Sequence, residues 1–230
     1  MPASAFTVAI LAGGAATRLG GRDKGLELLG GRPLIEWVID ALAGMEPAKS
    51  SPSRGRLSGD GVHCDATSIA AEAVPTMGCG DTLIVANRHL DEYARRAPAI
   101  CDSVSGFHGP LAGIAAALAQ YPIPWLLTVP VDCPDPPRDL ALRLAEVLRE
   151  ADAAAVVAHD GERRQPLFAL YRRELAQSAA DALATGQGVH RWQNSIGARE
   201  VDFSDRRRQF HNLNTREDFI AYAERHRLAG

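Results

Sequence analysis

Long apolar runs are missing from this sequence. No stretch approaches the roughly 18 apolar residues that a membrane-spanning helix needs. The first residues also lack a positively charged cluster ahead of a short apolar segment, which a secretory signal would show. We therefore expect no membrane partner and a cytoplasmic location.

Cysteine and net charge are also scarce. The four cysteines include no CxxC pair, which predicts reduced thiols and no disulfide framework. A formal net charge of −3 gives no broad attraction for nucleic acid, so any anion must bind at a local site. The 230 residues are 46% hydrophobic, and they predict a single domain with a sizeable core.

A glycine-rich segment with two cations follows the first apolar run. Residues 6–10 have the character of a strand, and residues 11–26, LAGGAATRLGGRDKGL, come directly after them. Glycines let backbone N–H groups approach an anion closely, while Arg18 and Lys24 add full positive charge. The segment predicts a binding site for a polyphosphate. It is neither a Walker A loop, because no hydroxyl residue follows Lys24, nor a dinucleotide fingerprint, because the G-x-G-x-x-G spacing is absent.

Strand-like and helix-like segments alternate along the chain. This alternation predicts an α/β fold with a mainly parallel central sheet and helices on both faces. Two later strands, joined around a turn at Asp160-Gly161, predict an antiparallel edge. Thr215 and Asp218 have the spacing of a reciprocal cap at the start of the last helix. We expect strands at residues 6–10, 83–86, 99–101, 125–129, 154–158 and 166–170, and helices at 34–42, 110–118, 138–149, 172–184 and after 215.

One segment, residues 47–80, does not fit this pattern. It is rich in Ser, Gly, Pro and Ala, and it has few large apolar residues to bury. We expect a disordered or surface insertion within the single domain of residues 1–230, with a functional loop as the alternative. His63, Cys64 and Cys79 lack a clear fourth zinc ligand, which disfavours a metal site there.

Polar residues follow the predicted parallel strands, at the edge where such sheets bind ligands. Asp132 is the strongest candidate for Mg²⁺, because one carboxylate plus substrate phosphates is a common way to hold this ion; the alternative is a cap or turn residue. Asp102 could accept hydrogen bonds from a guanine base, or it could be a turn residue. Asn87 offers a donor and an acceptor to a ribose or a base edge.

The glycine-rich segment resembles the signature L-A-G-G-x-x-x-R-x-G-G-x-D-K-G-L of the nucleotidyltransferase family that includes the molybdenum cofactor guanylyltransferases. Order and spacing are similar across nearly the whole chain, apart from residues 47–80. The further similar segments are Val85–Arg88, Gly109–Gly113, Val129–Pro134, His159–Arg163, Val201–Asp205 and Asn212–Thr215.

The resemblance implies a Rossmann-like, three-layer nucleotidyltransferase fold and an enzyme that makes a guanine dinucleotide cofactor from GTP and molybdopterin. It also implies Mg²⁺ on Asp132, and Asn212 and Asn214 near the second substrate or the metal. Transient contacts with cofactor-biosynthesis proteins or target molybdoenzymes belong to the same expectation. The residues that contact GTP are expected to be Leu11, Ala12, Gly13, Gly14, Lys24, Asn87, Asp102 and Asp132.

The expected reaction needs little covalent chemistry from the protein. With the triphosphate held by the glycine-rich backbone, an acceptor phosphate attacks the α-phosphorus in line and expels pyrophosphate, while Lys24 and Arg18 stabilise the transition state together with the Asp132-bound metal. Arg163 and Gln165 are candidates for contact with the acceptor phosphate, or they are solvated residues beside a turn. Alternative functions are transfer from CTP, transfer to a sugar or polyol phosphate, and non-catalytic carriage of the cofactor.

Two further clusters have simpler expected roles. The three arginines at 206–208 are expected to form an exposed, solvated face. Trp192 is expected to pack in the core rather than form a binding surface with its neighbours.

Overall fold

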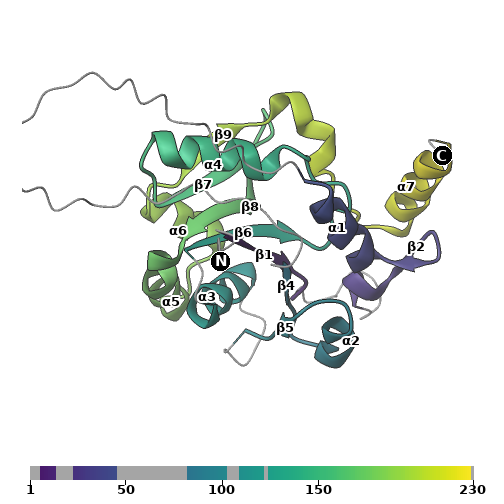
Figure 1. Cartoon of the computed structure of the whole chain (residues 1–230), viewed down its shortest axis with the longest axis horizontal. Helices are drawn as coiled ribbons and strands as arrows, with labels where there is room; N and C mark the ends of the chain where they lie inside the picture. Colours follow the sequence, from purple (N-terminus) through teal and green to yellow (C-terminus); the bar gives the residue numbers. More distant parts are fainter. Residues whose placement is uncertain (1–5, 14–22, 46–81, 103–108, 122–123, 229–230) are drawn as a thin grey trace, which may run out of the picture.

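The computed structural model describes residues 6–13, 23–45, 82–102, 109–121 and 124–228 of the chain, which form a layered α/β fold (Figure 1). A seven-stranded sheet with the order β5-β4-β1-β6-β8-β7-β9 lies in the middle. Its strands are β1 (Phe6–Leu11), β4 (Thr82–Val85), β5 (Ala99–Ile100), β6 (Trp125–Pro130), β7 (Ala155–His159), β8 (Arg164–Arg172) and β9 (Arg199–Asp202). A separate hairpin is formed by β2 (Leu28–Leu29) and β3 (Arg32–Pro33).

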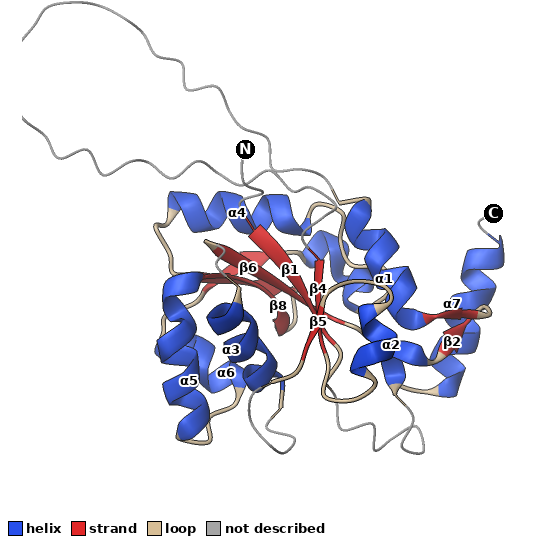
Figure 2. Ribbon diagram, turned by 60° about the horizontal axis from the view of Figure 1, so that its bottom comes forward, coloured by secondary structure: helices blue, strands red, loops and turns tan. Residues whose placement is uncertain are grey.

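Helices cover both faces of the sheet, as Figure 2 shows: α1 and α4 lie on one side, and α3, α5 and α6 lie on the other. The α-helices are α1 (Leu34–Ala43), α2 (Leu90–Ala94), α3 (Pro110–Gln120), α4 (Leu140–Glu150), α5 (Ala176–Ala184), α6 (Val189–Ser195) and α7 (Arg216–Leu228). Three 3₁₀ turns, η1 (Lys24–Leu26), η2 (Arg173–Leu175) and η3 (Ser204–Phe210), complete the described elements. The three-layer α/β fold predicted from the alternation is confirmed.

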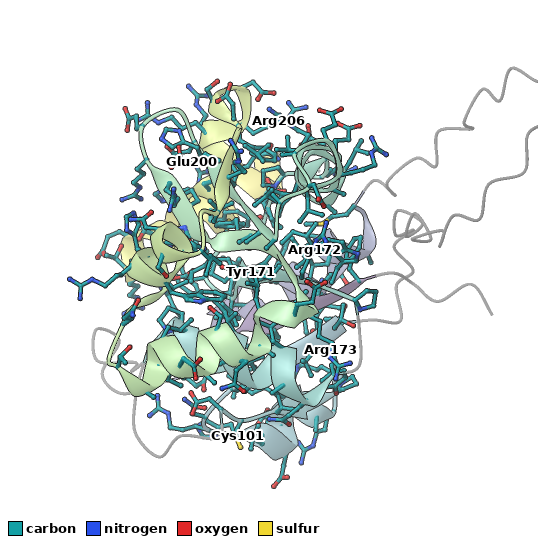
Figure 3. The ribbon with its side chains drawn as sticks, turned by 90° about the vertical axis from the view of Figure 1, so that its left-hand side faces the viewer. Cys101, Tyr171, Arg172, Arg173, Glu200 and Arg206 are labelled. Carbon is teal, nitrogen blue, oxygen red and sulfur yellow. The ribbon has the colours of Figure 1, made fainter. Side chains whose placement is uncertain are left out.

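Every strand of the large sheet except β8 runs in the same direction. The strands β5, β4, β1 and β6 pair in parallel, and β7 and β9 pair in parallel beyond β8. β8 is antiparallel to both of its neighbours, β6 and β7. The antiparallel pairing predicted for the two later strands is therefore confirmed, with β8 inserted between β6 and β7. No strand is predicted from the sequence at the position of β9, which forms one end of the sheet. In Figure 3, Glu200 of β9 and Cys101 after β5 lie at opposite ends of the molecule.

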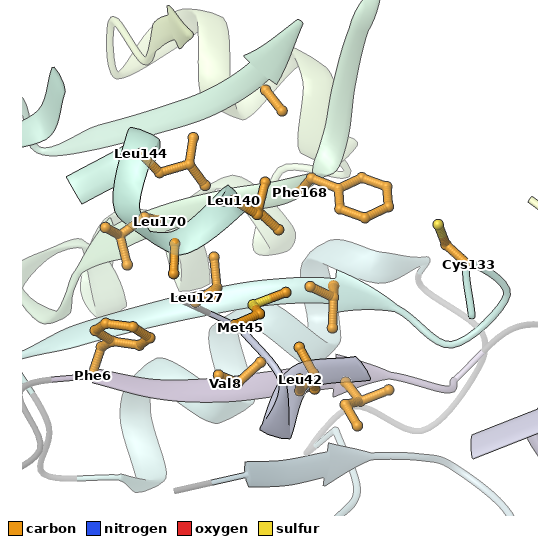
Figure 4. Close-up of a cluster of buried hydrophobic side chains, with 14 of the residues drawn as sticks. Phe6, Val8, Leu42, Met45, Leu127, Cys133, Leu140, Leu144, Phe168 and Leu170 are labelled. Carbon is orange, nitrogen blue, oxygen red and sulfur yellow. The ribbon is translucent and has the colours of Figure 1, made fainter. Parts of the chain in front are cut away.

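Side chains of β1 alternate between two hydrophobic cores, because successive residues of a strand point to opposite faces. Val8 and Ile10 enter the core beneath α1 and α4, where Leu127 of β6 also packs (Figure 4). Ala9 and Leu11 enter the core beneath α3, α5 and α6. The strand is thus buried on both faces, which agrees with its continuous apolar run.

The second core also contains the predicted core tryptophan. Trp192 is 1% exposed, and its ring stacks on Tyr171 with the centroids 5.2 Å apart. Gln193 lies beside it and donates to the Tyr171 hydroxyl at 2.6 Å. The expectation that Trp192 packs in the core is confirmed.

A third, smaller cluster joins α7 to the β2–β3 hairpin and to α1. Leu29, Leu34, Leu213 and Tyr222 are buried in it. The start of α7 carries the predicted reciprocal cap at Thr215 and Asp218: the Asp218 N–H donates to the Thr215 hydroxyl at 3.1 Å, and the Thr215 N–H donates to the Asp218 carboxylate at 2.8 Å.

Some expectations fall outside the described residues. These are the 47–80 insertion, with His63, Cys64 and Cys79, and the loop residues Gly14 and Arg18. Within the described ranges, no helix has both the length and the apolar character to cross a membrane.

Candidate active site

The loops after β1, β4 and β6 leave the same edge of the sheet, where the strand order reverses around β1. Backbone hydrogen bonds fix the end of β1 on both sides. The Ala12 N–H donates to the Val85 carbonyl at 2.8 Å, and the Val131 N–H donates to the Leu11 carbonyl at 3.1 Å. A crevice at such a reversal is the general ligand site of open parallel sheets.

Three side chains meet on one flank of this edge, and we call them the Lys24 cluster: Lys24, Asp132 and Asn214. The Lys24 ammonium lies 3.0 Å from Asp132 Oδ2 and 2.8 Å from Asn214 Oδ1. The side chains of Lys24 and Asp132 are 22% and 21% exposed, so the pair lies in a partly buried position open to a ligand. Lys24 and Asp132 come from the segments after β1 and β6, and Asn214 comes from just before α7. The fold therefore brings together three residues that the sequence singled out separately.

Asp132 retains one unused oxygen. Its Oδ1 atom is buried and has no hydrogen-bond partner among the described residues. The backbone of Asp132 is held in place, because its carbonyl accepts from the Leu213 N–H at 2.8 Å. Asn212 Oδ1 is also buried, and it has no hydrogen-bond partner within the described part of the chain. A buried carboxylate oxygen without a donor is costly unless a cation or a proton satisfies it, and oxygen atoms are the ligands that Mg²⁺ prefers. The residues present therefore fit a divalent cation on Asp132.

Lys24 is positioned by contacts that the sequence analysis did not anticipate. Asp23 caps η1: its Oδ1 accepts from the Gly25 N–H at 3.1 Å and from the hydroxyl of Tyr93 in α2. Burial, and then the hydrogen bond to Asp23, raise the pKa of the Tyr93 hydroxyl, so it stays protonated and can donate. A Cβ atom on Gly25 would lie 2.3 Å from this hydroxyl oxygen, so the close packing requires glycine.

A second pair, Asn87 and Asp102, lies at the ends of β4 and β5. Asn87 Nδ2 donates to Asp102 Oδ2 at 2.7 Å, and the Asp102 N–H donates to Asn87 Oδ1 at 3.3 Å. A Cβ on Gly13 would lie 3.5 Å from Asn87 Nδ2, so the pair borders the backbone at the end of β1. Asn87 thus orients the Asp102 carboxylate, and Asp102 Oδ1 accepts no hydrogen bond from the described residues.

The two candidates beside the β7–β8 turn lie in different surroundings. Gln165 is 7% exposed and donates to Asp160 Oδ2, while the Arg163 side chain is 76% exposed and 3.9 Å from the same carboxylate. Burial opposes ionisation of Asp160, but N–H donation from Arg163 and Glu162 lowers its pKa below the ordinary value. Gln165 therefore stabilises the β7–β8 turn through its hydrogen bond to Asp160. Binding of the acceptor by Arg163 and Gln165 stays a prediction.

Of the functional residues that sequence reasoning missed, only Asp23 carries a local signal. An aspartate directly before a turn is a typical cap, and it precedes Lys24 in the glycine-rich segment. Tyr93 lies 70 positions from Asp23, and no sequence pattern connects the two.

Comparison with known proteins reveals relatives along nearly the whole chain. The family model described as MobA-like NTP transferase domain matches residues 8–51 and 66–201. The molybdenum cofactor guanylyltransferase of Vibrio cholerae is 34% identical over 218 residues, which cover 94% of this chain and 91% of that protein. The protein of the same name from Serratia proteamaculans is 34% identical over 221 residues, covering 95% and 94%.

Solved structures agree on the fold. The crystal structure of molybdopterin-guanine dinucleotide biosynthesis protein A from Archaeoglobus fulgidus superposes with a TM-score of 0.69 at 21% identity, over 97% of this chain and 100% of that chain. A nucleotidyl transferase from Methanothermobacter gives a TM-score of 0.64 at 16% identity, over 98% and 99%. The chain therefore belongs to the MobA-like NTP transferase family, and it is a nucleotidyltransferase similar over nearly its whole length to molybdenum cofactor guanylyltransferases.

Proposed function

We propose that this enzyme transfers GMP from GTP to the terminal phosphate of molybdopterin and releases pyrophosphate. The observation that carries the proposal is the Lys24 cluster, which combines an ammonium group with a carboxylate that retains a buried, unpaired oxygen. The relatives that are 34% identical to this chain are named molybdenum cofactor guanylyltransferases, which supports a guanylyl donor and a molybdenum cofactor acceptor.

The nucleotide is proposed to span the edge of the sheet. Its guanine lies at the Asn87–Asp102 pair, where Asp102 accepts from the ring N–H and the exocyclic amine. Its phosphates are proposed to lie against the backbone at the end of β1 and directly after it, at Leu11, Ala12, Gly13 and Gly14. Lys24 then stands beside the phosphates, at the flank that β6 contributes.

The protein binds and orients the reacting groups in this reaction. An oxygen of the acceptor phosphate attacks the α-phosphorus of GTP, and the bond from that phosphorus to the leaving pyrophosphate breaks. Lys24 and Arg18 stabilise the charge that develops on the phosphoryl oxygens. No general base is required, because the acceptor phosphate is already ionised near neutral pH.

Asp132 is the residue proposed to hold Mg²⁺, through Oδ1, with Asn212 and Asn214 nearby. A magnesium ion held by Asp132 would supply positive charge that neutralises the phosphates. Lys24 keeps Asp132 Oδ2 occupied, which leaves Oδ1 as the oxygen for the ion.

Pyrophosphate release tests the proposal directly. The purified protein is incubated in Mg²⁺ with each of the four nucleoside triphosphates, with and without molybdopterin. We expect release that depends on both GTP and molybdopterin. Release with CTP instead, or release that needs a sugar phosphate, would assign the enzyme to another member of the nucleotidyltransferase class. No release with any pair would favour a carrier.

A further inference from the structure

A cavity of about 250 Å³ is lined by direct sequence neighbours of Asp132 and Asn212, and none of the predicted site residues lines it. One wall begins with Cys133, the residue after Asp132. Another includes His211, the residue before Asn212. These two walls meet at the site, because the Leu213 N–H donates to the Asp132 carbonyl at 2.8 Å. The cavity lining is therefore tied through the backbone to the segments that carry Asp132 and Asn214.

The charges around the cavity favour an anion. Arg208 and Arg225 line it, and Asp135 is the one carboxylate among its lining residues. The neighbouring Arg207 forms an ion pair with Glu162, whereas Arg208 forms no ion pair or hydrogen bond with the described residues. The Arg225 guanidinium lies 5.9 Å from the centre of the Tyr222 ring and has no carboxylate partner within the described part of the chain. Arg208 matches the expected exposed face of residues 206–208, yet it also borders this cavity.

The cavity also contains a flat aromatic wall. Tyr222 and His226 of α7 stack with their ring centroids 4.1 Å apart and their planes at 26°. Trp37 of α1 packs edge-on against Tyr222 at 6.2 Å, so Tyr222 is only 7% exposed, and His226 is the exposed ring of the stacked pair. Gln209 adds an amide that can both donate and accept. Aromatic faces beside guanidinium groups are suited to a planar, electron-rich ring with anionic substituents.

The size of the cavity limits what can occupy it. Pockets that bind drug-sized ligands have volumes of about 300–1,000 Å³, so a cavity of 250 Å³ suits one small ring system rather than a complete nucleotide. The guanine end of GTP is already assigned to the Asn87–Asp102 pair, on the side of β1 away from β6. We propose that the cavity holds the pterin ring of the acceptor, with the ring against the exposed His226, which stacks on Tyr222, and with its polar groups at Arg208 and Arg225. The acceptor phosphate then extends toward Lys24, so this inference rests on the proposed function.

The double variant Arg208→Ala/Arg225→Ala tests this assignment. Arg207→Ala is the matched control, because it removes a neighbouring arginine that is paired with Glu162 and does not line the cavity. We expect the double variant to raise the KM for molybdopterin at least tenfold, with the KM for GTP unchanged. The control should keep both constants. Thermal melting of the three proteins shows that all of them are folded.

A binding measurement separates this inference from the proposed function. The fluorescence of 6-carboxypterin, an anionic pterin, is titrated with wild-type protein in the absence of GTP, so no turnover is needed. Binding that is lost in the double variant and kept in Arg207→Ala supports the cavity even if the wild type transfers no GMP. If GMP transfer occurs and the KM for molybdopterin is the same in the double variant, the assignment is wrong. Without transfer, equal binding of 6-carboxypterin by the two proteins, or none by the wild type, overturns it.

Discussion

Substituting Gly25 by alanine should disable the enzyme while leaving every proposed ligand contact chemically intact. The new Cβ would lie 2.3 Å from the Tyr93 hydroxyl oxygen and 3.0 Å from Val131 Cγ2. Real Cβ atoms almost never approach closer than 3.0 Å, so the contact must open by at least 0.7 Å, the difference between 3.0 and 2.3 Å. Tyr93 is fully buried and cannot move freely, so η1 is displaced together with Lys24.

The expected magnitudes follow from this displacement. Forcing an extra methyl group into a packed interior costs about 1–3 kcal/mol of unfolding free energy. Misplacing a catalytic group by about 1 Å can lower kcat by about 10²-fold. Both effects are measurable, by urea denaturation and by the rate of pyrophosphate release at saturating substrates.

The double variant Gly25→Ala/Tyr93→Phe distinguishes a clash from a general loss of packing. Removing the tyrosine hydroxyl removes the atom nearest to the new Cβ, and the next contacts are at 3.0 and 3.2 Å. We expect the double variant to be more stable than Gly25→Ala, so that the two substitutions couple favourably. Wild-type stability and kcat in Gly25→Ala would refute the argument that Tyr93 and Asp23 position Lys24.

Three other substitutions test separate parts of the account. Lys24→Ala should lower kcat by about 10²-fold or more, with a smaller effect on the KM for GTP, as stopped-flow or steady-state rates will show. A change in KM alone would mean that Lys24 stabilises the bound substrate and the transition state equally. Asp102→Asn should narrow the preference for GTP over ITP and ATP. If the oxygen of the new amide keeps its hydrogen bond to Asn87, its N–H₂ group faces the N–H groups of guanine and cannot accept from them. Unchanged ratios of kcat/KM for GTP against ITP and ATP would place base selection elsewhere. Asp218→Asn should cost about 1 kcal/mol of stability at pH 7, because N–H donation from Asn214 and Thr215 holds the pKa of Asp218 below its ordinary value. A lowered folded-state pKa stabilises the fold above about pH 4, and this contribution is lost as the pH falls further. Urea denaturation should therefore show the unfolding free energies of wild type and variant converging in acid. A difference that stays constant with pH would contradict the cap.

The fold was predictable where burial fixes the sequence pattern. Residues 6–10 and 125–129 are continuous apolar runs because both faces of their strands are covered, and they correspond to β1 and β6. The β9 strand was missed because, at Arg199–Asp202, three of its four residues are exposed and it has no apolar run. The short α2 helix was also missed; it begins after His89, which has a left-handed backbone that no propensity rule anticipates.

The candidate site was predictable to the extent that each residue follows a strand or belongs to a motif. Asp132 and Asp102 were found from their places after apolar strands, and Lys24 was found from the glycine-rich segment. Their partners depend on tertiary packing: Asn214 reaches Lys24 from 190 positions away, and Tyr93 reaches Asp23 from 70 positions away. Sequence separations of this size leave no local pattern to detect.

The central claim is that Asp132 supports nucleotidyl transfer through a metal bound at its free oxygen. The most direct measurement uses GTP labelled at the α-phosphate, with molybdopterin and Mg²⁺, and follows the label into a guanine dinucleotide. The account predicts labelled dinucleotide and unlabelled pyrophosphate from the wild type, and the same products from Asp181→Ala, which removes an exposed carboxylate on α5. Asp132→Ala should form no labelled dinucleotide while melting at a similar temperature. Near-normal labelling with Asp132→Ala would contradict the claim.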